Sequence, residues 1–279
     1  MASRVVALTA LALLGFASNS LLCRLALGTG AIDAASFTLV RLVSGALTLG
    51  VLAGGPSALR THGNWRSAVA LFAYAALFSF SYVRIGAAAG ALLLFGAVQV
   101  TMLGAGLAAG ERFSMRGAAG LALALAGVVA LVAPGLSAPE PLGAALMLAA
   151  GVAWGGYSLR GRGAQRPLLE TAGNFTRSVP LVLLLAIASI GARHLTPRGI
   201  LLAAASGSLA SGVGYSLWYA ALPALGAVRA GIVQLSVPVI TAAAAALVLG
   251  EPVTARLLAA GAAVLGGVAI ALLGPQARR

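Results

Sequence analysis

The residues that could do chemistry are a few polar side chains inside long apolar runs. Gln99 and Gln234 each lie near the middle of such a run, and a glutamine amide can both donate and accept hydrogen bonds. Such an amide can bind the ammonium, carboxylate or indole N–H of a small molecule, or it can join two helices. Asn19 and Asn174 carry the same two interpretations, because a polar group is costly in hydrocarbon.

Two arginines and a serine near a proline add further candidates. Arg41 and Arg177 lie near the beginnings of their apolar runs. Such side chains either extend to lipid headgroups or provide a positive field that attracts a carboxylate. Ser236 and Pro238 interrupt another run, where the proline removes a backbone donor. The interruption either only kinks the helix, or it leaves a backbone carbonyl free to face a bound small molecule.

Aromatic residues make up only 6% of the chain, yet they gather in a few places. Phe78 and Tyr82 end one apolar run, and Trp154 and Tyr157 lie within another. Aromatic rings are common at membrane interfaces, which is one explanation. The other is that they line a cavity, where they stack on a planar cargo or hold an ammonium.

Composition places the whole chain in a membrane. It is 61% hydrophobic and 8% charged, with a mean hydropathy of +1.03; soluble domains carry roughly 25% charged residues. Arginines give a net charge of +13, but they lie at the ends of apolar runs, so we expect contact with a lipid bilayer and none with nucleic acid.

The acidic residues argue against several functions. We expect none of them at mid-membrane, since all five fall at helix ends or in breaks: Asp33, Glu111, Glu140, Glu170 and Glu251. A proton relay through a buried carboxylate is therefore not expected, and neither is a metal or another cofactor. Both histidines lie in loops, which disfavours a serine-based intramembrane protease. A phosphate-binding loop for ATP is absent from the sequence.

The length of the apolar runs predicts an all-α polytopic protein, because about 20 apolar residues cross a bilayer as a helix. Residues 5–27 are expected as a retained first helix. Counting arginines by side, eleven inside against four outside, predicts cytoplasmic termini. The ten expected helices are 5–27, 35–53, 67–85, 88–109, 115–133, 142–159, 168–190, 198–221, 226–249 and 254–273.

The chain also repeats itself. Residues 86–135 laid over 226–275 match at 13 of 50 positions, and Gly110-Glu111 falls on Gly250-Glu251. An offset of 136 places Arg24 on Arg160 and Arg41 on Arg177. This predicts two five-helix repeats, 1–135 and 136–279. Because five is odd, the second repeat is inverted, with a substrate site between the two near the midplane.

These features resemble the EamA-type exporters of the drug/metabolite transporter superfamily. The resemblance rests on the two five-helix halves, the Gly-Glu breaks, the segment Ala153-Trp154-Gly155 and Arg41. Within that group, the chain is most similar to bacterial inner-membrane exporters of aromatic amino acids. Such a resemblance implies helices around a central cavity, with the fifth helix of each half more peripheral.

We therefore expect an exporter of small metabolites, aromatic amino acids foremost, that works by alternating access as a monomer with both termini cytoplasmic. A sugar-phosphate or nucleotide-sugar carrier is the alternative, and an intramembrane enzyme or a passive scaffold remain further ones. The residues expected to contact the small-molecule substrate are Asn19, Arg41, Phe78, Tyr82, Gln99, Trp154, Tyr157, Arg177, Gln234 and Ser236.

Overall fold

The described part of the chain is helical throughout. The computed structural model describes residues 2–55, 62–109, 115–135, 137–161 and 164–273, and no strand forms among them. The α-helices are α1 (Ala2–Gly28), α2 (Ala34–Leu52), α4 (Trp65–Tyr82), α5 (Ala87–Ala108), α6 (Met115–Val132), α7 (Pro141–Gly161), α8 (Pro167–Ala188), α9 (Pro197–Ala205), α10 (Gly214–Gln234), α11 (Ser236–Leu249) and α12 (Ala255–Leu273). A 3₁₀ turn, η1 (Ile190–Ala192), and a π-helix, η2 (Ser206–Val213), complete the set.

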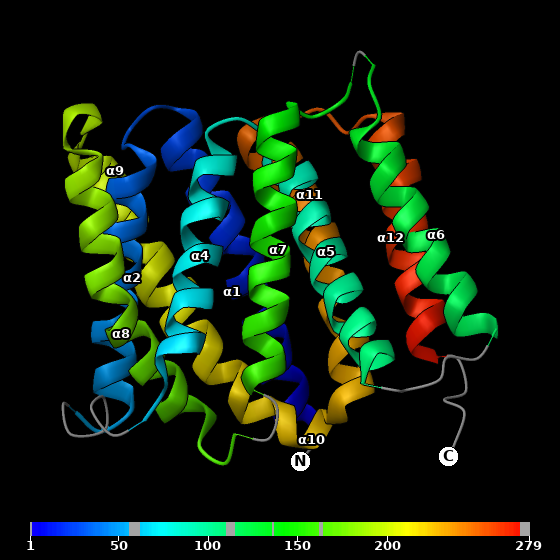
Figure 1. Cartoon of the computed structure of the whole chain (residues 1–279), viewed down its shortest axis with the longest axis horizontal. Helices are drawn as coiled ribbons and strands as arrows, with labels where there is room; N and C mark the ends of the chain where they lie inside the picture. Colours follow the sequence, from blue (N-terminus) through cyan, green and yellow to red (C-terminus); the bar gives the residue numbers. More distant parts are fainter. Residues whose placement is uncertain (1, 56–61, 110–114, 136, 162–163, 274–279) are drawn as a thin grey trace.

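Seven helices in this described part are long and apolar enough to cross a membrane. Helices satisfy their own backbone hydrogen bonds, which is the condition for spanning lipid. These observations confirm the expected fold class as far as an all-helical polytopic membrane protein. Helix α1 begins at the lower edge of Figure 1, and α12 runs from the upper toward the lower side of that view.

The helix ends follow local sequence signals. Asp33 caps α2 by accepting a hydrogen bond from the Ser36 N–H, and Asn64 caps α4 in the same way. Burial raises the pKa of Asp33, but hydrogen bonds from Ser36 and His194 outweigh it, so the pKa lies below its ordinary value. Gly250 ends α11 in the left-handed conformation that glycine tolerates best. Bounds expected from the sequence mostly agree to within a few residues.

One expected break is wrong. The sequence suggested a break at residues 223–225, but α10 continues through Pro223 and bends at the lower edge of Figure 1. The helix ends at Gln234 instead. Pro238 has no N–H to donate to the Gln234 carbonyl, so the helix ends at Gln234, four residues before that proline. The expected interruption near Ser236 and Pro238 is therefore present, at Leu235.

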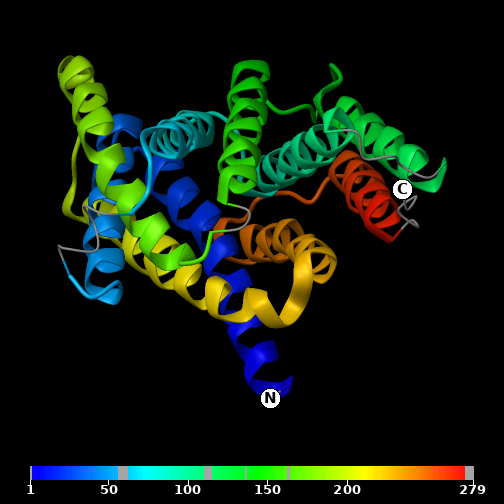
Figure 2. The ribbon, with the colours of Figure 1, turned by 60° about the horizontal axis from the view of Figure 1, so that its bottom comes forward.

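Small residues let the helices approach closely, as lipid-embedded helices require. Helices α6 and α12 pack together at one end of the molecule, as both views show (Figures 1 and 2). Gly120 and Gly267 form the crossing point: a Cβ placed at Gly267 would lie 2.5 Å from the Ala124 nitrogen. At the neighbouring Gly266, a Cβ would meet nothing within 4 Å.

This pair of glycines gives a matched test of the packing. We expect Gly267→Ala to destabilise the protein by about 1–3 kcal/mol, because the methyl group forces two backbones apart. Gly266→Ala should be neutral or slightly stabilising, because alanine is the better helix former. Thermal or denaturant unfolding in detergent measures both. Equal effects of the two substitutions would contradict the close contact.

Candidate functional site

The interior of the helix bundle holds a buried arginine. Arg41 lies in α2 and is 1% exposed. Its Nη2 donates a hydrogen bond to the Tyr74 hydroxyl at 3.0 Å. The guanidinium carbon lies 4.8 Å from the ring centre of Phe78 and 5.2 Å from that of Tyr74. The interpretation that Arg41 extends to lipid headgroups is therefore wrong, because the neighbouring helices enclose its whole side chain.

A polar network joins Arg41 to two more elements. The Asn19 amide in α1 donates to the Tyr74 hydroxyl at 3.4 Å, and the Ser206 hydroxyl donates to the Asn19 carbonyl oxygen at 2.6 Å. We call Asn19, Arg41, Tyr74 and Ser206 the central network. Its geometry depends on η2, whose Gly207 lies so close to the Arg41 carbonyl that a side chain would not fit. π-Helical turns are frequent at functional sites.

Aromatic rings surround this network. Trp154 in α7 lies at their middle, with ring centres 4.7 Å from Tyr74, 5.2 Å from Tyr157 and 5.4 Å from Tyr215. Phe78 continues the series to Tyr82, at 4.6 Å. We call these six residues the ring cluster. It draws on helices from both the first and the second half of the chain, because α4, α7 and α10 all contribute.

Arg41 is only partly satisfied. Its Nε and Nη1 atoms are buried and have no hydrogen-bond partner. The acids that the structure describes lie elsewhere, at helix ends and loops: Asp33, Glu140, Glu170 and Glu251. An arginine is always charged, so the central network carries one positive charge that no described carboxylate balances. A charged group at such a place is a functional-site candidate by default.

The structure brings only some of the expected residues together. Arg177 in α8 is half-buried and donates to the carbonyls of His62 and Gly173, outside the central network. Gln99 in α5 is 3% exposed. Gln234 ends α10 and is half-buried, rather than lying in the middle of a continuous helix. The Ser236 hydroxyl donates to the Val233 carbonyl of its own chain segment.

The expected cavity residues are packed rather than open. Phe78 and Tyr82 are fully buried, and Tyr82 lies directly over Gly90 of α5. Tyr157 donates to Thr171 and accepts from Asn174, both at 3.4 Å. The resemblance implied helices around a central cavity, and the positions of the aromatic residues suggested that their rings line it. In this conformation the rings instead fill the centre, because they stack on one another.

Sequence reasoning missed two members of the central network. Tyr74 precedes Phe78 and Tyr82 by four and eight residues, which puts the three on one helix face, and this signal was available. Ser206 lies 187 residues from its partner Asn19, and nothing local in the sequence marks the pair.

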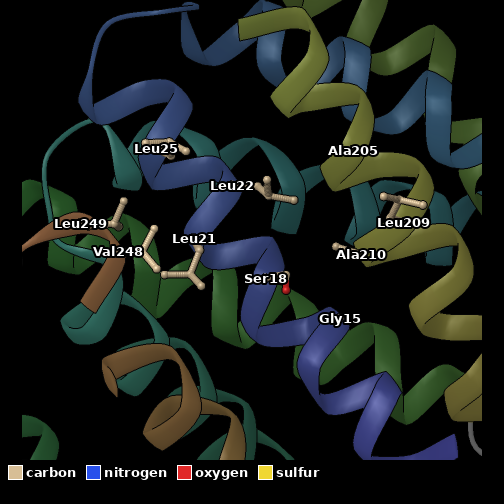
Figure 3. A pocket seen from close by; sticks show the side chains of 10 residues that line it. All are labelled: Gly15, Ser18, Leu21, Leu22, Leu25, Ala205, Leu209, Ala210, Val248 and Leu249. Carbon is tan, nitrogen blue, oxygen red and sulfur yellow. The ribbon is translucent and has the colours of Figure 1, made fainter. Parts of the chain in front are cut away.

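A separate groove opens beside α1 (Figure 3). It has a volume of about 370 Å³ and is almost entirely apolar. The residues that line it belong to α1, α9, η2 and α11: Gly15, Ser18, Leu21, Leu22, Leu25, Ala205, Leu209, Ala210, Val248 and Leu249. It shares no residue with the central network, so it is a different feature.

A charged contact joins the end of α1 to the segment between α11 and α12. Arg24 Nε lies 3.3 Å from Glu251 Oε1, and Arg24 Nη1 donates to the Tyr82 carbonyl at 2.9 Å. The same carboxylate accepts from the N–H groups of Ala87 and Ala88, the first residues of α5. Glu251 therefore caps a helix of the first half from the second half of the chain.

The comparisons with known proteins agree with a transporter. The model of the EamA-like transporter family matches residues 141–273. An uncharacterized protein of Pseudomonas aeruginosa is 53% identical over 99% of this chain and 96% of its own length. A probable amino-acid metabolite efflux pump of Salmonella typhimurium is 28% identical over 72% of this chain and 73% of its own.

A solved crystal structure has the same fold. It superposes with a TM-score of 0.68 and covers 96% of this chain and 97% of its own, at 22% identity. At that identity the likeness concerns the fold alone.

The Arg24 contact predicts unequal effects for two arginines at the same edge. Arg24→Ala should lower unfolding stability by about 1–3 kcal/mol, because it leaves the partly buried Glu251 carboxylate and the Tyr82 carbonyl without this donor. Arg84→Ala is the control, since its pair with Glu140 is 4.0 Å long and exposed, and such pairs contribute about 0–1 kcal/mol. Unfolding of both variants in detergent checks this, and a larger loss for Arg84→Ala would contradict it.

Proposed function

Because the chain belongs to the EamA-like transporter family, we propose that it is a secondary carrier that exports small amphipathic metabolites, with aromatic amino acids as the first cargo class. The observation that carries the proposal is the ring cluster around Trp154, which encloses the central network between helices of both halves. Flat rings beside a cation and amide groups suit a small molecule that has a planar apolar part and a charged end.

We propose further that residues 1–135 and 136–279 are two inverted repeats. Under the repeat offsets, α1 corresponds to α7, α2 to α8, α4 to α9–α10, α5 to α11 and α6 to α12. The helix contacts then come in matching sets, which supports the assignment. Corresponding helices touch in α2–α8, α5–α11 and α6–α12, and the contact α4–α7 has its counterpart in α1–α10.

The direction of the helices supports the same proposal. Helix α1 begins at the lower edge of Figure 1, whereas α7 begins at the upper edge. Two halves threaded in opposite senses can exchange roles, so that the central network is reached first from one side and then from the other. The excess of arginine in the segments expected on the inside, with Arg4, Arg66, Arg160 and Arg166 among them, favours cytoplasmic termini in a bacterial inner membrane.

A sugar-phosphate or nucleotide-sugar carrier is the second candidate. Such cargo carries two or more negative charges and calls for several cations around it. Arg41 is the one cation in the central network as described, because Arg177 binds loop backbone instead. An intramembrane enzyme is a weaker candidate still: His62 and His194, the residues a serine nucleophile would need, lie in loops.

Transport by the purified protein in liposomes tests the proposal. We expect exchange of labelled tryptophan, tyrosine or phenylalanine, and a loss of at least about tenfold in Trp154→Ala, which removes the ring at the middle of the cluster. Trp65→Ala is the matched control, because Trp65 is 56% exposed at the beginning of α4. If a wide amino-acid panel gives no flux above empty liposomes, the amino-acid assignment fails.

Dependence on protons tests the mechanism. The central network holds no described carboxylate that could carry a proton, so we expect exchange to continue without a pH gradient. The measurement compares flux in liposomes with equal pH on both sides and with an imposed gradient. Strict dependence on the gradient would contradict transport without proton coupling.

A further inference from the structure

We propose that Arg41 is a binding site for a single carboxylate, and that organic monoanions bind there more tightly than the zwitterionic amino acids of the proposed function, which bind through the same carboxylate contact. The inference concerns the same site as the proposed function and rests on it for the route by which a ligand enters. The starting observation is that the Nε and Nη1 atoms of Arg41 have no hydrogen-bond partner. The residue is 1% exposed and has apolar and aromatic neighbours.

The neighbours of the guanidinium determine which chemical group could satisfy its unpaired N–H groups. Phe78 and Tyr74 lie within 4.8 and 5.2 Å of its central carbon and offer ring faces, which compensate part of the charge. Ring faces do not accept the N–H hydrogen bonds that point out of the guanidinium edge. Of the guanidinium nitrogens, only Nη2 donates to the Tyr74 hydroxyl. The remaining N–H groups lie in one plane, and a carboxylate matches that planar arrangement.

The charge balance selects among carboxylates. A monoanion neutralises Arg41, whereas a zwitterion such as an amino acid leaves the total charge at one and brings an ammonium near the guanidinium. The acceptors that could compensate such an ammonium are already engaged. The Asn19 carbonyl oxygen accepts from Ser206, and the Tyr74 hydroxyl accepts from Asn19 and Arg41. No described carboxylate lies in the network to pair with it.

The ring cluster indicates the chemistry of the end of the ligand that is opposite the carboxylate. Trp154 is only half-buried and has Tyr74 and Tyr215 as ring neighbours at 4.7 and 5.4 Å. A planar aryl group can stack among these rings when the helices separate. The chemical class is therefore an aryl-substituted monocarboxylate, for example a 2-oxo acid or an arylalkanoate. Because Arg41 is enclosed here, such a ligand reaches it through the opening that alternating access supplies.

Calorimetric binding to the purified full chain tests the proposal with three probes of nearly equal shape. They are 3-phenylpropanoate, its uncharged amide 3-phenylpropanamide, and L-phenylalanine. We expect the carboxylate to bind at least about tenfold more tightly than either of the others, since a hydrogen bond to a charged group contributes roughly a factor of ten or more. Equal affinity for the carboxylate and the amide would overturn the proposal.

Variants identify the residue. Arg41→Gln should remove the preference for the carboxylate, and Arg41→Lys, which keeps the charge but not the planar fork, should reduce it partly. Arg160→Gln removes the same charge from an exposed position, where the guanidinium binds the Gly156 carbonyl of its own helix, and should leave the preference unchanged. A preference that survives in Arg41→Gln would overturn the assignment. If Arg41→Gln fails to fold, the three probes and Arg41→Lys still decide it.

The outcome is separable from that of the proposed function. Preferential binding of the carboxylate without flux of any cargo in liposomes supports the anion site and refutes the carrier. Flux of amino acids in liposomes without binding of the carboxylate supports the carrier and refutes the anion site.

Discussion

The structure depends on one constraint: a polar group away from water must find its partner within the protein. The helices meet this condition for the backbone, and the central network meets it for part of the side chains. Asn19, Tyr74 and Ser206 lie on three different elements. Each of them forms a hydrogen bond with another member of the central network. These bonds form only because small residues bring the backbones close, as Gly207 does against α2. Close packing and polar satisfaction are therefore the same requirement here.

Among the described residues of the first half, the two arginines that are buried or half-buried show how differently that requirement is met. Arg24 has a carboxylate, Glu251, and a backbone carbonyl, so its charge is balanced where the helices end. Arg41 has one hydroxyl and two ring faces, so its charge stays unbalanced at the centre. A balanced contact holds two halves of a protein together. An unbalanced one makes the enclosed conformation costly, and any ligand or movement that supplies an acceptor lowers that cost.

The helices could be predicted from the sequence, because the constraint that lipid imposes is local. An apolar run of the right length and the residues that cap it lie side by side in the chain, as with Asp33 before α2. The site could not be predicted to the same degree, since its bonds join Asn19 to residues 55 and 187 positions away. The depth of Arg41 likewise depends on α4 and η2, which pack over it. Gln234 lies at a helix end because of Pro238, and an apolar pattern alone does not locate such a break.

The enclosed centre also bears on how a carrier of this kind would release its cargo. A ligand that neutralised Arg41 and stacked on Trp154 would favour whichever conformations admit it, by the difference between its affinities for the open and enclosed forms. Very tight binding in one open form would hold the protein there. A single cation with neutral neighbours avoids this, because it offers one strong contact rather than several. Moderate affinity in both open forms is the condition for repeated passage between them.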